Sequence, residues 1–237
     1  MQSVLEYWPV WMRGLWTTVW LSVCIVVFAS VGSTALGVAR TAKSPLVAIP
    51  ARFVTESLRA PSAIVLLFWV FFVLPLVPGM LTLSPVAVAI VVLTLVGSAY
   101  GADIVRAGIE SVNAGQFDAC HALGLSTYQT LHKVIVPQAL SQIVPAYGGA
   151  ARSMIKWTSL LSFIGVQDVL YVANFVRGQT YETFIVLMLL SGCYWLLCLV
   201  CGLIFRAIEK TLPLNRALQR ASRETPTEMI ATAGVPQ

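Results

Sequence analysis

The chain has 237 residues, of which 58% are hydrophobic and only 11% are charged. Soluble domains average roughly 45 to 50% apolar residues and about 25% charged residues. The mean hydropathy of +0.82 shows that the apolar excess extends over the whole chain. This composition excludes an ordinary water-soluble globular protein, and a net charge of only +5 does not predict a nucleic-acid partner. We therefore predict an all-α membrane protein whose main solvent is lipid.

Uncharged stretches locate the membrane-spanning segments, because a charge near the bilayer centre costs about 2.5 to 3.5 kcal/mol on insertion scales. The uncharged stretch 60–102 is long enough to cross the membrane twice, and prolines and a glycine between positions 75 and 85 indicate a turn within it. The sequence thus predicts five transmembrane helices: one in residues 14–39, two in 60–102, one in 134–167 and one in 183–205.

Basic residues decide the orientation, since cytoplasmic segments carry an excess of lysine and arginine. With the N-terminus outside, the outer segments hold only Arg13 and Arg177, and the fourth span holds Arg152 and Lys156. The remaining eleven of the 15 basic residues lie inside: Arg40, Lys43, Arg52, Arg59, Arg106, Lys133, Arg206, Lys210, Arg216, Arg220 and Arg223. We therefore predict an N-out, C-in topology.

The segment between the third and fourth spans is polar and rich in helix signals. Asn113 can cap a first short helix, with Gln116 three residues on. Gly124 followed by the apolar Leu125 is typical of a helix that ends in a Schellman motif.

A second short helix is predicted to open at Ser126, with Gln129 completing a capping box. Pro137 marks the point where this helix gives way to the fourth span. The apolar face of the second helix consists of Tyr128, Leu131 and Ile135. On periodicity alone, the two helices could equally be an interfacial pair that lies on the membrane.

Two basic residues, Arg152 and Lys156, share one face of the predicted fourth helix. An ionisable residue within a span is a candidate functional residue. In the structural alternative, Arg152 reaches to the cytoplasmic edge, and Lys156 pairs with Asp103, Asp168 or helix-end carbonyls. Of the two residues, Lys156 is the stronger candidate for a solute path.

The residues around Lys156 suit a path for a polar solute. The hydroxyl groups of Thr158 and Ser159 follow Lys156 within three positions. The Lys156 ammonium can bind a carboxylate, and the indole of Trp157 can contact an organic cation. Asp103 is the nearest acid by topology, and for Tyr100 core packing is the alternative. The candidate path consists of Tyr100, Asp103, Lys156, Trp157, Thr158 and Ser159.

Motifs of common catalytic sites are missing from the sequence. A P-loop needs a glycine directly before its lysine, and no lysine of the chain follows a glycine. Neither the HExxH zinc motif nor the G-x-S-x-G nucleophile elbow occurs, and the cysteines form no paired CxxC set. We therefore predict no catalytic residue, no metal and no cofactor.

The polar segment also carries a specific spacing. An Asp-Ala-Cys run at 118–120 is followed after three residues by Gly124 and, after nine more, by Val-Ile-Val-Pro at 134–137. This resembles the EAA loop of ATP-binding-cassette (ABC) importer permeases, in which E-A-A, three residues, G, nine residues and I-x-L-P follow one another. The resemblance implies an ATPase-coupling loop with the candidate residues Asp118, Ala119, Cys120, Gly124, Leu125 and Ser126.

Further segments extend the resemblance over about residues 13–212, to the polar amino acid permease family of ABC importers. They are GLWTTVWLSV at 14–23, LSP at 83–85, SAYGADIVRAGIESV at 98–112 and KWTSLLSFIG at 156–165. The resemblance implies a type I importer permease in a bacterial plasma (inner) membrane. The implied partners are a second permease subunit of the same or a similar sequence, two ATPase subunits, an extracytoplasmic solute-binding protein and a small polar solute.

Two departures from the family pattern leave the substrate open. SLRAP stands at 57–61 where the family usually has Phe-Arg-Gly-Thr-Pro, and KWTS at 156–159 where it has Lys-Asp-Thr-Ser. Amino acids, ectoine-like compounds and opines all stay open as substrates. The rival from another class is an ion-coupled secondary carrier that uses Asp103 and Lys156, although no inverted repeat is visible.

We divide the chain into a permease domain, residues 1–222, and a short tail, residues 223–237. The tail is polar and has no sustained apolar face. We therefore expect it to be disordered in the cytoplasm.

Overall fold

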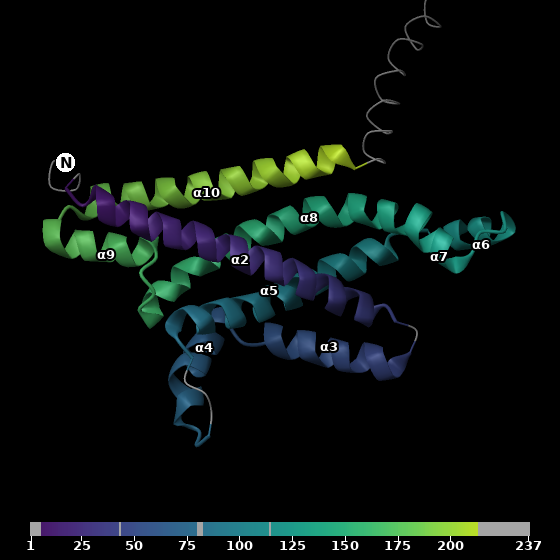
Figure 1. Ribbon diagram of the computed structural model, residues 1–237, viewed down its shortest axis with the longest axis horizontal. Coiled ribbons are helices and arrows are strands. Elements are labelled where there is room, and N and C mark those ends of the chain that lie inside the picture. The colour runs from purple at the N-terminus through teal and green to yellow at the C-terminus, as the bar shows by residue number, and fades with distance from the viewer. Residues whose placement is uncertain (1–5, 43, 80–82, 114, 213–237) are drawn as a thin grey trace, which may run out of the picture.

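The structure is a computed structural model that describes residues 6–42, 44–79, 83–113 and 115–212. Every regular element in these ranges is helical (Figure 1), which confirms the prediction of an all-α protein. The expected disordered tail and the domain boundary at residue 222 lie outside the described residues.

Three helices are long and apolar enough to cross a membrane on their own: α2 (Trp8–Arg40), α5 (Pro85–Glu110) and α10 (Thr183–Thr211). They correspond to the first, third and fifth predicted spans. At the start of α5, the Ser84 hydroxyl accepts a hydrogen bond from the Ala87 N–H (3.3 Å). Pro85 occupies the first turn of α5, where a backbone N–H has no partner within the helix, so proline breaks no hydrogen bond there.

The second predicted span is built differently from the expectation. The pieces α4 (Ala63–Phe68), η1 (Trp69–Val73) and η2 (Leu74–Leu76) have only 6, 5 and 3 residues, too few to cross a bilayer. An additional helix, α3 (Pro45–Arg59), precedes them, and the two parts together reach the length of a span with a bend of 92°. The break falls at Ser62, whose backbone is extended.

The fourth predicted span is also bent. The π-helical turn η3 (Leu131–Ile135) runs directly into α8 (Val136–Trp157), and the 3₁₀ helix η4 (Thr158–Ile164) continues it. After a break, α9 (Val169–Thr180) follows at an angle of 53°. Pro137 lies in the first turn of α8, so it marks the point where the preceding turn gives way to the fourth span, as the sequence predicts.

By length and composition, the described residues provide three spans, or five if each bent pair crosses once. The count of five and the N-out orientation thus stay predictions. Figure 1 places the short helices α6 (Gly115–Ala122) and α7 (Thr127–Thr130) at one end of the long axis and α9 at the other. The end of α2 and the start of α3 lie toward the same end as α6 and α7.

The core lies where α2, α5 and α8 meet, around Leu21, Leu93 and Met154. Backbones approach closely there: a Cβ added to Gly101 of α5 would lie 2.0 Å from Ser33 Oγ of α2. In contrast, α10 leaves most of its apolar side chains exposed within this chain. An apolar helix surface of this kind suits contact with lipid or with another subunit.

Candidate functional site

In the segment between α5 and α8, the first short helix, α6, begins and ends where the sequence predicts. At the start of α6, the Asn113 Oδ1 atom accepts a hydrogen bond from the Gly115 N–H (2.9 Å). After the end of α6, Gly124 has a left-handed φ of +73°. The Leu125 N–H donates to the Cys120 carbonyl (3.0 Å), which is the six-to-one bond of a Schellman motif. The predicted start and end of this helix are confirmed.

The capping box of α7 is confirmed as well. The Ser126 N–H donates to Gln129 Oε1 (3.0 Å), and the Gln129 N–H donates to Ser126 Oγ (3.3 Å). Of the large apolar residues here, Leu123 and Tyr128 are exposed, while Ile135 at the end of η3 is buried. The caps fix the shape of this loop, and its exposed apolar side chains suit contact with another protein.

The predicted coupling residues occupy α6 and its end. Asp118, Ala119 and Cys120 lie on α6, and Cys120 is buried. Nothing is described of the Asp118 side chain, so its predicted role stays a prediction.

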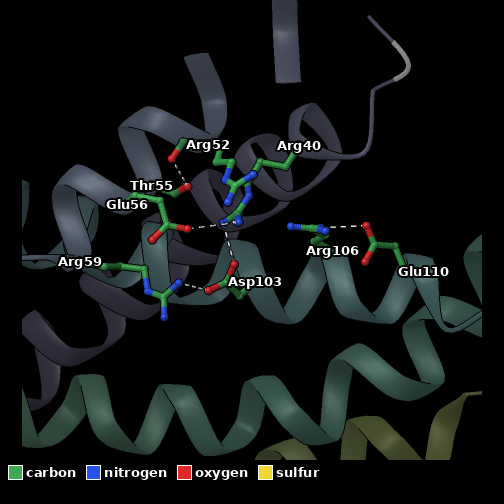
Figure 2. Close-up of polar contacts among 8 residues, drawn as sticks. All are labelled: Arg40, Arg52, Thr55, Glu56, Arg59, Asp103, Arg106 and Glu110. Atoms are coloured by element: carbon green, nitrogen blue, oxygen red, sulfur yellow. Dashed lines mark hydrogen bonds and ion pairs between the residues drawn. The ribbon is translucent and has the colours of Figure 1, made fainter. Parts of the chain in front are cut away.

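A cluster of charged residues joins α2, α3 and α5 (Figure 2). The Arg40 Nη1 atom donates to Asp103 Oδ1 at 2.6 Å, and Arg59 Nη1 donates to the other oxygen of Asp103. Arg40 Nη2 lies 3.6 Å from Glu56 Oε1. The Arg40 side chain is only 4% exposed, so its charge needs these two carboxylates.

This cluster corrects the expected partner of Asp103. Each Asp103 oxygen is bonded to an arginine, so the alternative pair of Lys156 with Asp103 is not formed. The alternative pair with Asp168 is not formed either, because the Asp168 oxygens accept hydrogen bonds from the Tyr171 N–H (2.9 Å) and the Tyr194 hydroxyl (3.4 Å). Both carboxylates therefore serve to hold helices together.

Aromatic rings extend the cluster toward α8. The Arg59 guanidinium carbon lies 5.1 Å from the centre of the Tyr100 ring, within the range of a cation–π contact. The Tyr100 ring in turn lies 5.4 Å from the Trp157 ring, centre to centre, at 57°. Three sequence-predicted path residues, Tyr100, Asp103 and Trp157, are thereby brought together with Arg59, which the prediction did not include.

The remaining predicted path residues occupy the junction of α8 and η4. Lys156 is exposed, and among the described residues its ammonium has no ion-pair partner. The Thr158 hydroxyl is buried and donates to the Ile155 carbonyl (2.7 Å). The Ser159 hydroxyl donates to the Lys156 carbonyl (2.8 Å). Both protons are directed at the backbone, so neither hydroxyl is free to donate a hydrogen bond to a solute.

Arg152 lies one turn before Lys156. Its Nε donates to the Gly148 carbonyl (3.2 Å), one turn nearer the start of α8. Together with Arg206 and Glu209 it lines a cavity of about 220 Å³ between α8 and α10. This geometry agrees with the structural alternative for Arg152, a side chain directed back toward the predicted cytoplasmic edge.

Arg40 and Arg59 were absent from the sequence-predicted site, yet the sequence holds a signal for them. Arg40 directly follows the uncharged stretch 14–39, whereas Arg59 directly precedes and Asp103 directly follows the stretch 60–102. Charges that bound uncharged spans at the same predicted side of a membrane lie at similar depth, so they are natural partners.

Apolar helices of membrane-crossing length, charges confined to their ends and a capped polar loop define a multi-span membrane protein. Residues 12–212 match the family model described as "Binding-protein-dependent transport system inner membrane component". Because the match covers most of the chain, the chain belongs to this family. It is an inner-membrane permease subunit, and a permease subunit is not itself the catalytic part of a transporter.

Named relatives of this chain indicate which kind of permease it resembles. The chain is 34% identical over 212 residues to a probable amino-acid ABC transporter permease protein, y4tF, of Sinorhizobium fredii, covering 88% of this chain and 89% of that one. It is 28% identical over 204 residues to a putative glutamine transport system permease protein of Rickettsia conorii, covering 86% and 93%. The resemblance to ABC permeases for polar amino acids is confirmed.

A solved structure supports the same class. The fold resembles a chain in the crystal structure of an amino acid ABC transporter with histidines, with a TM-score of 0.80 and 26% sequence identity. The match covers 89% of this chain and 98% of that chain. The fold is therefore that of a type I ABC importer permease, as predicted.

Proposed function

We propose that this permease moves an amino acid or a similar small polar solute across the inner membrane, along a path bordered by Tyr100, Asp103, Lys156, Trp157, Thr158 and Ser159. The observation that carries the proposal is the exposed Lys156 that directly precedes Trp157 in the chain, whose ring contacts that of Tyr100. A cation inside a span without an ion-pair partner among the described residues is costly, so it needs a functional reason.

The chemistry of these groups suits a zwitterion. The Lys156 ammonium can hold a carboxylate, and the half-buried Trp157 ring offers its face to an ammonium group. Arg59 is held by Asp103 and Tyr100, so it shapes the path and supplies little free charge. Relatives named for amino acids, glutamine and L-cystine favour an amino acid over ectoine-like compounds or opines.

The driving force would come from partner subunits. We propose that two ATPase subunits dock on the α6–α7 loop through Gly124, Leu125 and Ser126, with Asp118, Ala119 and Cys120 on the adjacent helix. A second permease of the same or a similar sequence would complete the path, and an extracytoplasmic binding protein would deliver the solute. ATP hydrolysis then supplies the free-energy difference between the inward-open and outward-open states.

The permease domain would end near residue 222, and the tail 223–237 would take no part in the path. The rival function, an ion-coupled carrier that uses an Asp103–Lys156 pair, loses its basis because Asp103 is bonded to two arginines. We therefore offer no second function.

Uptake by proteoliposomes tests the proposal. The chain, its ATPase and its binding protein are reconstituted together, and radiolabelled amino acids are offered with ATP or with a non-hydrolysable analogue inside. We expect uptake only with ATP and binding protein. Lys156→Met should lower uptake at least ~10-fold at normal complex yield, while Lys156→Arg should keep most of it. ATP-independent uptake, or full uptake by Lys156→Met, would contradict the proposal.

A further inference from the structure

A pocket of about 200 Å³ lies between the end of α2, the first half of α3 and the last turns of α5. Its lining consists of Arg40, Ala48, Ile49, Arg52 and Arg106. Since one water occupies roughly 30 Å³, the pocket has room for a group the size of a phosphate. Three arginines from three different helices therefore meet around one small space.

The charges around the pocket are not balanced. Arg40 faces Asp103 and Glu56, and the Arg106 Nε donates to Glu110 (2.8 Å). Among the residues that the structure describes, the Arg52 guanidinium has no ion-pair partner, although Figure 2 shows its side chain extending toward that of Arg40. Like charges that share a pocket repel each other unless an anion lies between them.

A second observation points to a missing acceptor. The Arg40 side chain is only 4% exposed, and its Nε is a buried donor without a hydrogen-bond partner in the described part of the chain. A buried donor of this kind costs free energy until an acceptor reaches it. An anion in the pocket would offer a negative counter-charge to Arg52 and acceptor oxygens to Arg40.

The pocket lies at the predicted inner boundary of the membrane. Arg40 is the first charged residue after the uncharged stretch 14–39, and the last turns of α5 begin just after the stretch 60–102 ends at Asp103. The helix α3 is amphipathic and exposes Leu46, Ile49 and Phe53 on its outer side. A helix that combines such an apolar face with arginines suits the region where acyl chains meet headgroups.

We propose that this pocket binds the phosphate group of an anionic phospholipid from the inner leaflet, held by Arg40, Arg52 and Arg106. Arginine binds phosphate oxygens through paired N–H groups. Basic pockets between helices at the cytoplasmic side are suited to acidic headgroups. The acyl chains of the bound lipid would lie against Ile49 and the apolar face of α3.

Lipid retention by the purified chain tests the proposal. Detergent-solubilised protein is titrated with phosphatidylglycerol or with phosphatidylcholine, and bound lipid is counted by native mass spectrometry. We expect preferential binding of phosphatidylglycerol, weakened ~10-fold in Arg52→Gln, because one charge-assisted contact to the phosphate is lost. Arg52 is exposed and has no ion-pair partner in the described part of the chain, so this variant should fold normally.

Arg177→Gln is the matched control, because Arg177 is also exposed and lies on α9, at the other end of the molecule. Equal lipid loss in both variants, or no preference for phosphatidylglycerol, would overturn the proposal. A competition arm with inorganic phosphate distinguishes the sources of the phosphate group. Displacement of the lipid by millimolar phosphate would assign the pocket to a free anion and overturn the lipid assignment, whereas resistance to it supports the lipid.

Discussion

Asp103 and Arg40 form an ion pair, with 2.6 Å between Oδ1 and Nη1, that ties the C-terminal end of α2 to α5. Arg59 bonds the second oxygen of the same carboxylate from the end of α3, directly before the 92° bend. One acidic residue therefore holds three helices at the point where the chain turns into α4. The same carboxylate positions Arg59, whose guanidinium carbon lies 5.1 Å from the centre of the Tyr100 ring.

Removal of this carboxylate should destabilise the protein. Asp103→Asn would leave Arg40 buried with only Glu56 as a partner. We expect a loss of order 2 kcal/mol, less than the ~3 to 5 kcal/mol of a fully buried pair, because 36% of the Asp103 side chain is exposed. The midpoint of thermal unfolding in detergent measures this loss. Glu110→Gln, which removes an exposed pair with Arg106, is the control and should change stability by less than ~0.5 kcal/mol.

Lys156 and Asp103 should act independently of each other. No contact joins them, so the effects of Lys156→Met and Asp103→Asn on uptake and on complex yield should add, with a coupling below ~0.5 kcal/mol. The measurement is a double-mutant cycle in proteoliposomes. Recovery of uptake in the double variant would mean that the two residues pair in a working state of the transporter, and Lys156 would then lose its place in the solute path.

Local signals in the sequence were enough for part of the fold. The caps at Asn113 and Ser126 and the left-handed Gly124 each depend on residues within a few positions, and all three have the expected geometry. The uncharged stretches likewise located α2, α5 and α10, because burial in lipid constrains each helix separately.

Tertiary contacts explain what the sequence did not reveal. The helix α3 carries Arg52, Glu56 and Arg59, so a search for uncharged stretches treats it as a loop. Two of its charges are acceptable because Arg40, 16 positions away, neutralises Glu56 and Asp103, 44 positions away, neutralises Arg59. No local pattern can specify such a contact.

The close approach of α2 and α5 should not tolerate added volume. In Gly101→Ala, the new Cβ would lie 2.0 Å from Ser33 Oγ and 2.7 Å from the Tyr147 ring, so the helices must separate. We expect destabilisation of ~1 to 3 kcal/mol, the usual range for overpacking. Thermal unfolding of the purified protein measures it. Gly192→Ala on α10, where a Cβ meets nothing within 4 Å, should be neutral or stabilising by up to ~1 kcal/mol.

The conformation of Gly124 should matter more than its surroundings. A Cβ there would meet nothing within 4 Å, but φ is +73°, which β-branched residues strongly disfavour. Gly124→Val should therefore cost ~1 to 2 kcal/mol and alter the angle between α6 and α7. We expect ATPase co-purification and uptake to fall together. Gly124→Asn should be milder, because asparagine tolerates this region; equal loss in both variants would point to contact with the ATPase surface instead of backbone geometry.

The N-out orientation can be tested by labelling. In a Cys-free background, single cysteines at Asn174 on α9 and Gln116 on α6 are both exposed within this chain. Because the basic residues place α9 outside and α6 inside, a membrane-impermeant maleimide added to intact cells should label position 174 and not position 116. After the membrane is permeabilised, both positions should react, which controls for burial in the assembled transporter. Labelling of position 116 in intact cells would reverse the assignment, and with it the placement of the arginine pocket at the inner leaflet.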